Sequence, residues 1–111
     1  MKLATKTGKF IEVSPVVDPI LEYHNLTLEQ LQGKSKKGNL PECRQWMAFF
    51  IRNIYPQVSL NSIALLCGKK SHVTILYSIK KVREEMESYL YKRHKYHELQ
   101  LAIGILIGEL K

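Results

Sequence analysis

The residues of this 111-residue chain that could do chemistry are mainly lysines and arginines gathered in its middle. Between Gly33 and Arg83, ten basic residues accompany a single acid, Glu42, which gives a local charge of +9, whereas the whole chain carries +7. Excess positive charge of this kind attracts phosphates and other polyanions. The distribution therefore predicts binding to nucleic acid, although a basic surface that serves only solubility would have the same composition.

The other candidates for chemistry do not form a catalytic set. The sequence has no Ser/His/Asp arrangement, no paired carboxylates and no G-x-x-x-x-G-K-[ST] loop that could cradle ATP. Cys43 and Cys67 lie among apolar neighbours and are expected to be reduced core residues. Together with His94 and His97 they lack the spacing of a zinc site. We therefore expect no enzyme activity, no cofactor and no bound metal.

Composition places the chain among soluble globular proteins, with 45% hydrophobic and 24% charged residues. No apolar run reaches the roughly 18–20 residues that a membrane span needs. The first residues also lack the apolar centre of a signal peptide. We expect a single domain in the cytoplasm without a membrane partner, and the predicted binding to nucleic acid would associate it with the nucleoid.

The basic residues must be positioned by helices, and the clearest element is a helix–turn–helix in which Ser59 caps a short helix, Gly68 ends it and Ser71 caps the next. The 3.6-residue period turns one side of the second helix toward the core: Ile75, Leu76, Ile79, Val82, Met86 and Leu90. The opposite side is expected to face outward: Val73, Thr74, Tyr77, Lys80 and Lys81. Small polar and basic residues behind a tight turn suit the DNA major groove, although an ordinary helical hairpin with a solvated basic face is the alternative.

Three further helices are expected before this element. The first opens at Asp18-Pro19, where an N-cap precedes a proline at the first helical position. The second opens at the capping box Thr27-Leu28-Glu29-Gln30. A flexible basic loop, residues 34–39, separates it from a third, aromatic-rich helix. This third helix is capped by Asn39 and Glu42 and ends before Pro56. These helices and the helix–turn–helix predict an all-α domain of about five helices.

The ends of the chain predict three segments: an N-terminal arm (1–15), a helix-turn-helix domain (16–98) and an apolar C-terminal tail (99–111). The arm is either disordered or an extended segment that docks on the body. The helix that contains Lys81 is expected to continue without a break, because no proline follows it, which gives a long C-terminal helix. The tail Leu99–Leu110 either packs back on the domain or forms a homo-oligomer contact.

Four segments, in this order, resemble the C-terminal DNA-binding domain of the bacterial replication initiator DnaA, a Trp-repressor-like helix-turn-helix domain. Two lie early: the opening and capped helices, Tyr23-His24-Asn25-Leu26-Thr27-Leu28-Glu29-Gln30-Leu31, and the basic loop, Lys34-Ser35-Lys36-Lys37. The third is Arg44-Gln45-Trp46-Met47-Ala48. The fourth is the signature Ser59-Leu60-Asn61-Ser62-Ile63 followed by Gly68-Lys69-Lys70-Ser71-His72-Val73-Thr74-Ile75-Leu76. The match covers a little over half of the chain and implies an all-helical fold that binds double-stranded DNA.

The resemblance also implies individual roles. Lys36 would reach the minor groove, and phosphates would be held by Arg44, Gln45 and Arg52. The major groove would receive His72, Val73 and Thr74, with Leu60 and Asn61 near thymine methyl groups or the backbone. The complete set of expected DNA-binding residues is Lys34, Lys36, Lys37, Arg44, Gln45, Arg52, Leu60, Asn61, Lys69, Lys70, Ser71, His72, Val73, Thr74, Tyr77 and Lys81.

The turn departs from the family pattern at four positions. Ser71 stands in place of Asp, which keeps the cap but removes a carboxylate that could accept a hydrogen bond from cytosine. Val73 replaces Thr, Lys70 replaces Arg, and Lys69 adds a positive charge. We expect phosphate attraction to be kept, whereas the family's usual target sequence is not carried over.

Two functions follow as hypotheses. The first is sequence-preferring binding to double-stranded DNA in replication control or transcription regulation. The alternative is a protein-interaction module that kept the fold but lost specific DNA reading, with the apolar tail as its oligomerisation surface.

Overall fold

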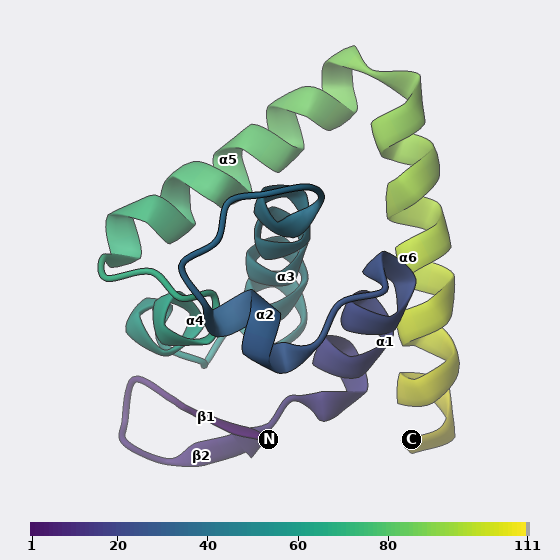
Figure 1. The fold of residues 1–111 in the computed structure, drawn as a ribbon. Helices are drawn as coiled ribbons and strands as arrows, with labels where there is room; N and C mark the ends of the chain where they lie inside the picture. Colours follow the sequence, from purple (N-terminus) through teal and green to yellow (C-terminus); the bar gives the residue numbers. More distant parts are fainter. Residues whose placement is uncertain (111) are drawn as a thin grey trace.

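Six helices and an N-terminal hairpin make up the computed structural model, which describes the backbone of residues 1–110 and the side chains of residues 1–104. The elements are β1 (Lys2–Ala4), β2 (Phe10–Glu12), α1 (Ser14–His24), α2 (Leu28–Gln32), α3 (Leu40–Ile54), α4 (Leu60–Leu66), α5 (His72–Ser88) and α6 (Leu90–Leu110). In Figure 1, α3 lies at the centre, and α5 and α6 form a V around it. The predicted all-α helix-turn-helix fold with a long C-terminal helix is confirmed.

The core is built around the aromatic side chains of α3. Trp46 is fully buried and stacks on Phe50, whose ring in turn stacks on Tyr96 of α6 with 5.6 Å between centroids. Cys43 and Cys67 are buried free thiols, as predicted, and burial raises the pKa of each to about 12. Neither cysteine therefore supplies a thiolate at neutral pH. None of the described helices is long and apolar enough to cross a membrane.

The N-terminal residues form a docked hairpin, which is the second of the two alternatives expected for the arm. β1 and β2 pair antiparallel, with Leu3 opposite Ile11. The carbonyl of Ala4 accepts hydrogen bonds from the Ser59 N–H (3.1 Å) and the Ser62 hydroxyl (3.0 Å), so the hairpin is fastened to the start of α4. The predicted segment boundaries near residues 15 and 98 both fall inside helices, α1 and α6.

One predicted helix start is wrong, one is correct in position but lacks the predicted side-chain cap, and one is confirmed. α1 begins at Ser14 rather than at Asp18, because Ser14 and a proline at the first turn already form a helix start and the next two valines are buried. The Asn39 side chain does not cap α3; its amide donates to the carbonyl of His24 at 2.8 Å. The capping box of α2 is present, with Thr27 and Gln30 bonded reciprocally.

The helix expected to run on without a break ends at Ser88. Tyr89 is extended, with φ −123° and ψ 120°, and α6 then turns back across α1. Leu99 and Ile103 are buried in the core as a result. Folding back removes these apolar side chains from water, which stabilises the fold. Local sequence does not show that this burial will occur. The tail therefore packs on the domain as far as Ile103, and the side chains from residue 105 onward lie outside the described residues.

An ion cluster fastens α6 to α3. The Nζ atom of Lys92, which is 4% exposed, lies 2.6 Å from Oε1 of Glu42 and 3.8 Å from Oε2 of Glu85. Lys95 binds the other oxygen of Glu42 at 2.7 Å. Burial alone would raise the pKa of the Glu42 carboxyl, but the hydrogen bonds from the two lysines outweigh burial and lower the pKa to about 2.

We expect this cluster to make the stability of the domain depend on pH. The pKa of Glu42 falls from 4.5 to about 2 on folding, so its contribution is complete above about pH 4.5 and is lost as the pH falls toward 2. Urea unfolding of the wild type and of Glu42→Gln at about pH 6 and about pH 3 measures this. The variant should lose less stability than the wild type on acidification, and equal losses would contradict the role given to Glu42.

Candidate nucleic-acid interface

The turn between α4 and α5 has the geometry of a helix-turn-helix. The Ser59 hydroxyl accepts from the N–H of Ser62 at 3.2 Å, and the Ser71 hydroxyl accepts from the N–H of Val73 at 3.2 Å, so both predicted caps are confirmed. Gly68 has the left-handed φ of +67° expected for the residue that ends α4. The turn thus presents the first residues of α5 at the surface.

The first turns of α5 expose the side that the sequence predicts. Val73 and Tyr77 are 61% and 66% exposed, and His72 is also exposed. Ser71 and Lys70 before the helix are exposed, whereas Thr74 and Lys81 are half-buried. The core side is formed by Ile75, Ile79 and Val82. The outward face is therefore available to a partner along at least two turns.

Two leucines predicted to face the core do not. Leu76 is 46% exposed and lies one turn beyond Val73, so it extends the outward face of α5. Leu90 is 74% exposed because α5 ends before it and the chain changes direction. On α4, Leu60 is half-buried and Asn61 is exposed. Leu76 lies at the edge of the apolar stripe, where helical spacing alone does not decide between the core and the outward side, so its exposure was not predicted.

The basic loop lies beside this face and is fully accessible. Lys34, Lys36 and Lys37 are exposed, and none of them forms an ion pair with any described residue. In the turn, Lys70 is exposed and Lys69 is half-buried, and neither forms an ion pair with a described residue. Because no acid neutralises these ammonium groups within the described part of the chain, the loop and the turn form one positively charged surface.

Arg44 organises the basic loop from beneath and does not fit the role of a phosphate contact. The side chain is only 4% exposed, and its guanidinium donates to four backbone carbonyls around the loop. The acceptors are Leu31 (2.9 Å), Gly33 (2.8 Å), Gln30 (3.2 Å) and Ser35. With its donors used inside the protein, Arg44 acts as a positioning residue for the loop, which corrects the expected role.

The turn touches the end of α2, directly before the basic loop. A Cβ atom added to Gly68 would lie 2.7 Å from the carbonyl oxygen of Gln32 and 2.8 Å from that of Gly33. Next to it, burial lowers the pKa of Lys69, and the positive charges of Arg44 and Lys36 lower that pKa further. An anion bound here would relieve this repulsion.

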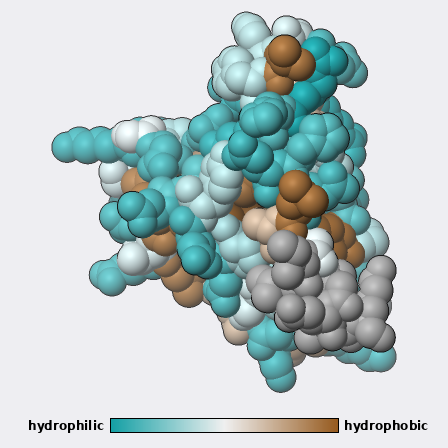
Figure 2. Space-filling model, turned by 90° about the vertical axis from the view of Figure 1, so that its right-hand side faces the viewer, coloured by the Kyte–Doolittle hydropathy of each residue, from teal (hydrophilic) through white to brown (hydrophobic). Residues whose placement is uncertain are grey.

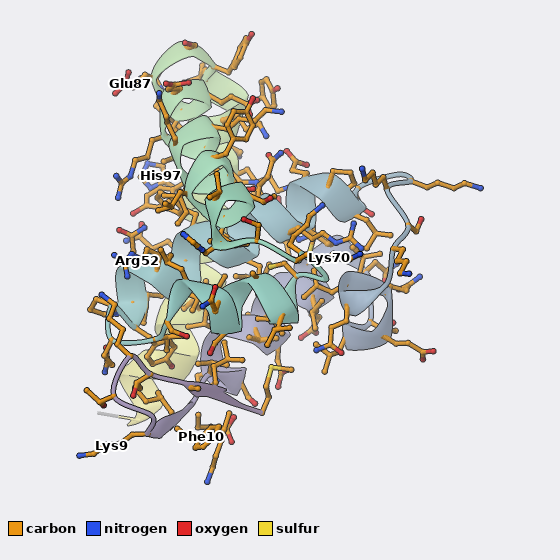
Figure 3. All side chains as sticks on the ribbon, turned by 90° about the vertical axis from the view of Figure 1, so that its left-hand side faces the viewer. Lys9, Phe10, Arg52, Lys70, Glu87 and His97 are labelled. Atoms are coloured by element: carbon orange, nitrogen blue, oxygen red, sulfur yellow. The ribbon has the colours of Figure 1, made fainter. Side chains whose placement is uncertain are left out.

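Two further predicted phosphate contacts, Gln45 and Arg52, lie on α3 and are half-buried. Nη1 of Arg52 donates to the carbonyl of Pro56 at 3.3 Å, which leaves other donors of its guanidinium available. In Figure 3, Arg52 and Lys70 lie on opposite sides of the start of α5. Of the predicted set, the residues of the loop, the turn and the outward side of α5 thus lie at the surface, whereas Arg44 is buried.

Comparison with known proteins finds a match for the region just described. A family model described as the bacterial dnaA protein helix-turn-helix matches residues 13–82, which contain α1 to α4 and most of α5. The chromosomal replication initiator protein DnaA of Borrelia turicatae (strain 91E135) is 33% identical over 86 residues, covering 78% of this chain and 18% of the relative.

More distant relatives carry the same name. The DnaA protein of Corynebacterium aurimucosum is 29% identical over 90 residues, which is 81% of this chain and 16% of the relative. That of Burkholderia multivorans is 24% identical over 98 residues, which is 88% of this chain and 18% of the relative. The chain therefore spans less than a fifth of the length of these relatives.

Proposed function

Because this chain belongs to the bacterial DnaA helix-turn-helix family of DNA-binding domains, we propose that it docks the first turns of α5 in the major groove of double-stranded DNA. The observation that supports this most strongly is the acid-free basic surface of the loop and the turn, which lies beside the exposed start of α5. Phosphates on either side of the groove supply the anions that this surface lacks.

Sequence preference would come from the outward side of α5. Val73 can contact a thymine methyl group, and the hydroxyl of Thr74 can form a hydrogen bond with a base edge. His72 and Tyr77 are exposed on the same stretch of helix. The Ser71 hydroxyl already accepts a hydrogen bond as the helix cap, so we assign Ser71 a role in the fold rather than in base recognition.

Phosphate contacts would come from the flanks. Lys36 would enter the adjacent minor groove. The residues that would contact the phosphates of the DNA backbone are Lys34, Lys37, Gln45, Arg52, Lys69, Lys70 and Lys81. At the start of α4, Asn61 and the half-buried Leu60 would lie near the sugar-phosphate backbone. Arg44 serves this surface indirectly by holding the loop carbonyls.

The relatives are named chromosomal replication initiators, so we place the function of this domain in the control of replication initiation. Binding near promoters, and hence transcription regulation, is a further use of the same contact. Both roles locate the domain on the nucleoid in the cytoplasm. The sequence has no phosphate-cradling loop for ATP, so the domain is proposed as a binding module without catalysis.

Fluorescence anisotropy with a labelled duplex tests the proposal. Binding should be measurable at about 50 mM salt, and Lys36→Ala should weaken all sequences and reduce the slope of log K against log [salt] by about 0.9. Thr74→Ala should leave that slope unchanged and alter the sequences selected from a random duplex pool. No duplex binding by the wild type at low salt would refute the proposal.

A second candidate function, homo-oligomerisation, rests on the exposed side of α6. Leu90 and Leu101 are 74% and 68% exposed, and a hollow of about 720 Å³ adjoins Leu90. Together with His94, His97 and Gly104 these leucines follow the alternating 4- and 3-residue spacing of a helix-pairing seam. Figure 2 shows this side of the molecule as largely hydrophilic with separate hydrophobic patches.

Sedimentation of the full chain tests this candidate. If α6 pairs with a second copy, Leu101→Glu should convert a concentration-dependent dimer to a monomer, because a charge would enter the seam. Phe10→Glu is the matched control, since Phe10 is 67% exposed on the hairpin. A wild type that stays monomeric at all concentrations would rule the candidate out. Truncation before Leu99 is unsuitable, because Leu99 and Ile103 belong to the core.

A further inference from the structure

The N-terminal hairpin is a basic element outside the matched family region, which begins at residue 13. It carries Lys2, Lys6 and Lys9, all exposed, and none of the three forms an ion pair with a described residue. The single acid of the hairpin, Glu12, is already occupied, because the N-terminal amine lies 2.6 Å from its carboxylate. The hairpin therefore has free positive charge at its tip.

The backbone of the tip is bonded to the segment just before α4. The N–H of Lys6 donates to the carbonyl of Gln57 at 3.1 Å, and Thr5 pairs with Val58 in an isolated β-bridge. Within the tip, the N–H of Thr5 donates to the carbonyl of Lys9 at 2.7 Å. Because Gln57 and Val58 directly precede the Ser59 cap, the lysines of the tip are fixed relative to the start of α4.

An open hollow adjoins the tip. A hollow of about 420 Å³ lies between the tip and Gln57, and the residues along it include Lys6, Thr7 and Lys9. Ammonium and hydroxyl groups are the donors that proteins present to phosphates. In Figure 3 the Lys9 side chain points away from the body of the molecule, at the edge next to Phe10.

We propose that the hairpin tip is an additional phosphate contact on the same duplex, placed on the side of α4 opposite the basic loop. In both Figure 1 and Figure 3, α4 lies between the hairpin and the loop. A duplex that receives α5 in its major groove would then meet positive charge on two flanks, from the loop and from Lys6 and Lys9. The inference rests on the proposed DNA binding and extends the footprint beyond the family region.

The test uses anisotropy of the full chain with a random-sequence duplex over about 50–200 mM salt. Lys6→Gln and Lys9→Gln should each reduce the slope of log K against log [salt] by about 0.9, and the double variant by about 1.8. Arg93→Gln removes the same charge from an exposed position on α6 and should leave the slope unchanged. Circular dichroism should show that all variants remain folded, since the substituted side chains are exposed.

The outcomes separate the two proposals. A wild type that does not bind duplex overturns the proposed function and the hairpin contact together. A wild type that binds with the same slope as the Lys6/Lys9 double variant overturns the hairpin contact alone. An equal loss of slope in Arg93→Gln also overturns it, because the effect would then be one of total charge.

Discussion

Arg44→Ala is expected to lower the free energy of unfolding by about 3–5 kcal/mol, since a hydrogen bond from a charged donor contributes about 1.5–3 kcal/mol and a stranded buried acceptor costs about 1–3 kcal/mol. The substitution strands the backbone carbonyls of Gln30, Leu31, Gly33 and Ser35. The loss stays below the sum of four bonds because water can reach the outer carbonyls of the loop once the side chain is gone. Chemical denaturation measures the change.

The same substitution should weaken binding to every duplex, because the loop that carries Lys36 would no longer be held beside the turn. Arg44→Lys should recover less than half of the stability, since an ammonium group cannot present the planar fork of a guanidinium. Lys36→Ala is the matched control and should keep stability within about 0.5 kcal/mol while reducing binding. An Arg44→Ala variant as stable as that control would refute the positioning role.

The second large effect is expected at Gly68. Gly68→Ala should destabilise the domain by roughly 2–5 kcal/mol, from about 1–2 kcal/mol for a left-handed alanine and about 1–3 kcal/mol for overpacking. The added Cβ would lie 2.7 Å and 2.8 Å from the carbonyl oxygens of Gln32 and Gly33, and backbone atoms cannot rotate away as a flexible side chain can. The turn must then move away from the end of α2, which also shifts the start of α5.

Gly38→Ala separates the two contributions. Gly38 has a similar φ of +59° but has open space where a Cβ would lie, so only the cost of the left-handed conformation, about 1–2 kcal/mol, should appear. Unfolding of both variants in urea gives the difference. If Gly68→Ala costs no more than Gly38→Ala, the contact between the turn and the end of α2 contributes nothing to the fold.

Local features of the helix-turn-helix were predictable because their causes are local. A serine cap, a left-handed glycine and a 3.6-residue apolar period each act within a few residues, and all three are present at Ser59, Gly68 and α5. The capping box at Thr27 is present for the same reason. The burial of Cys43 and Cys67 was also predictable, because it follows from their apolar neighbours in sequence.

The predictions were wrong where a polar side chain bonds to a part of the chain that is distant in sequence. Asn39 reads as a cap but bonds His24, and Glu42 reads as the other half of that cap but pairs with Lys92 and Lys95 on α6. Arg44 reads as a surface cation but is buried under a loop 9 to 14 residues before it. In each case several partners compete for one polar group, and only the folded arrangement decides among them.

The sequence by itself determined the fold class, the helix-turn-helix and the positive charge around it, because these depend on periodicity, caps and composition. Tertiary structure decided that the N-terminal residues form a docked hairpin, that the chain turns at Tyr89 and that Arg44 faces inward. The physical reason is burial: Leu99 and Ile103 leave water only if α6 folds back onto α1, and the loop carbonyls leave water only if a buried guanidinium meets them. Neither requirement can be read from neighbours in sequence.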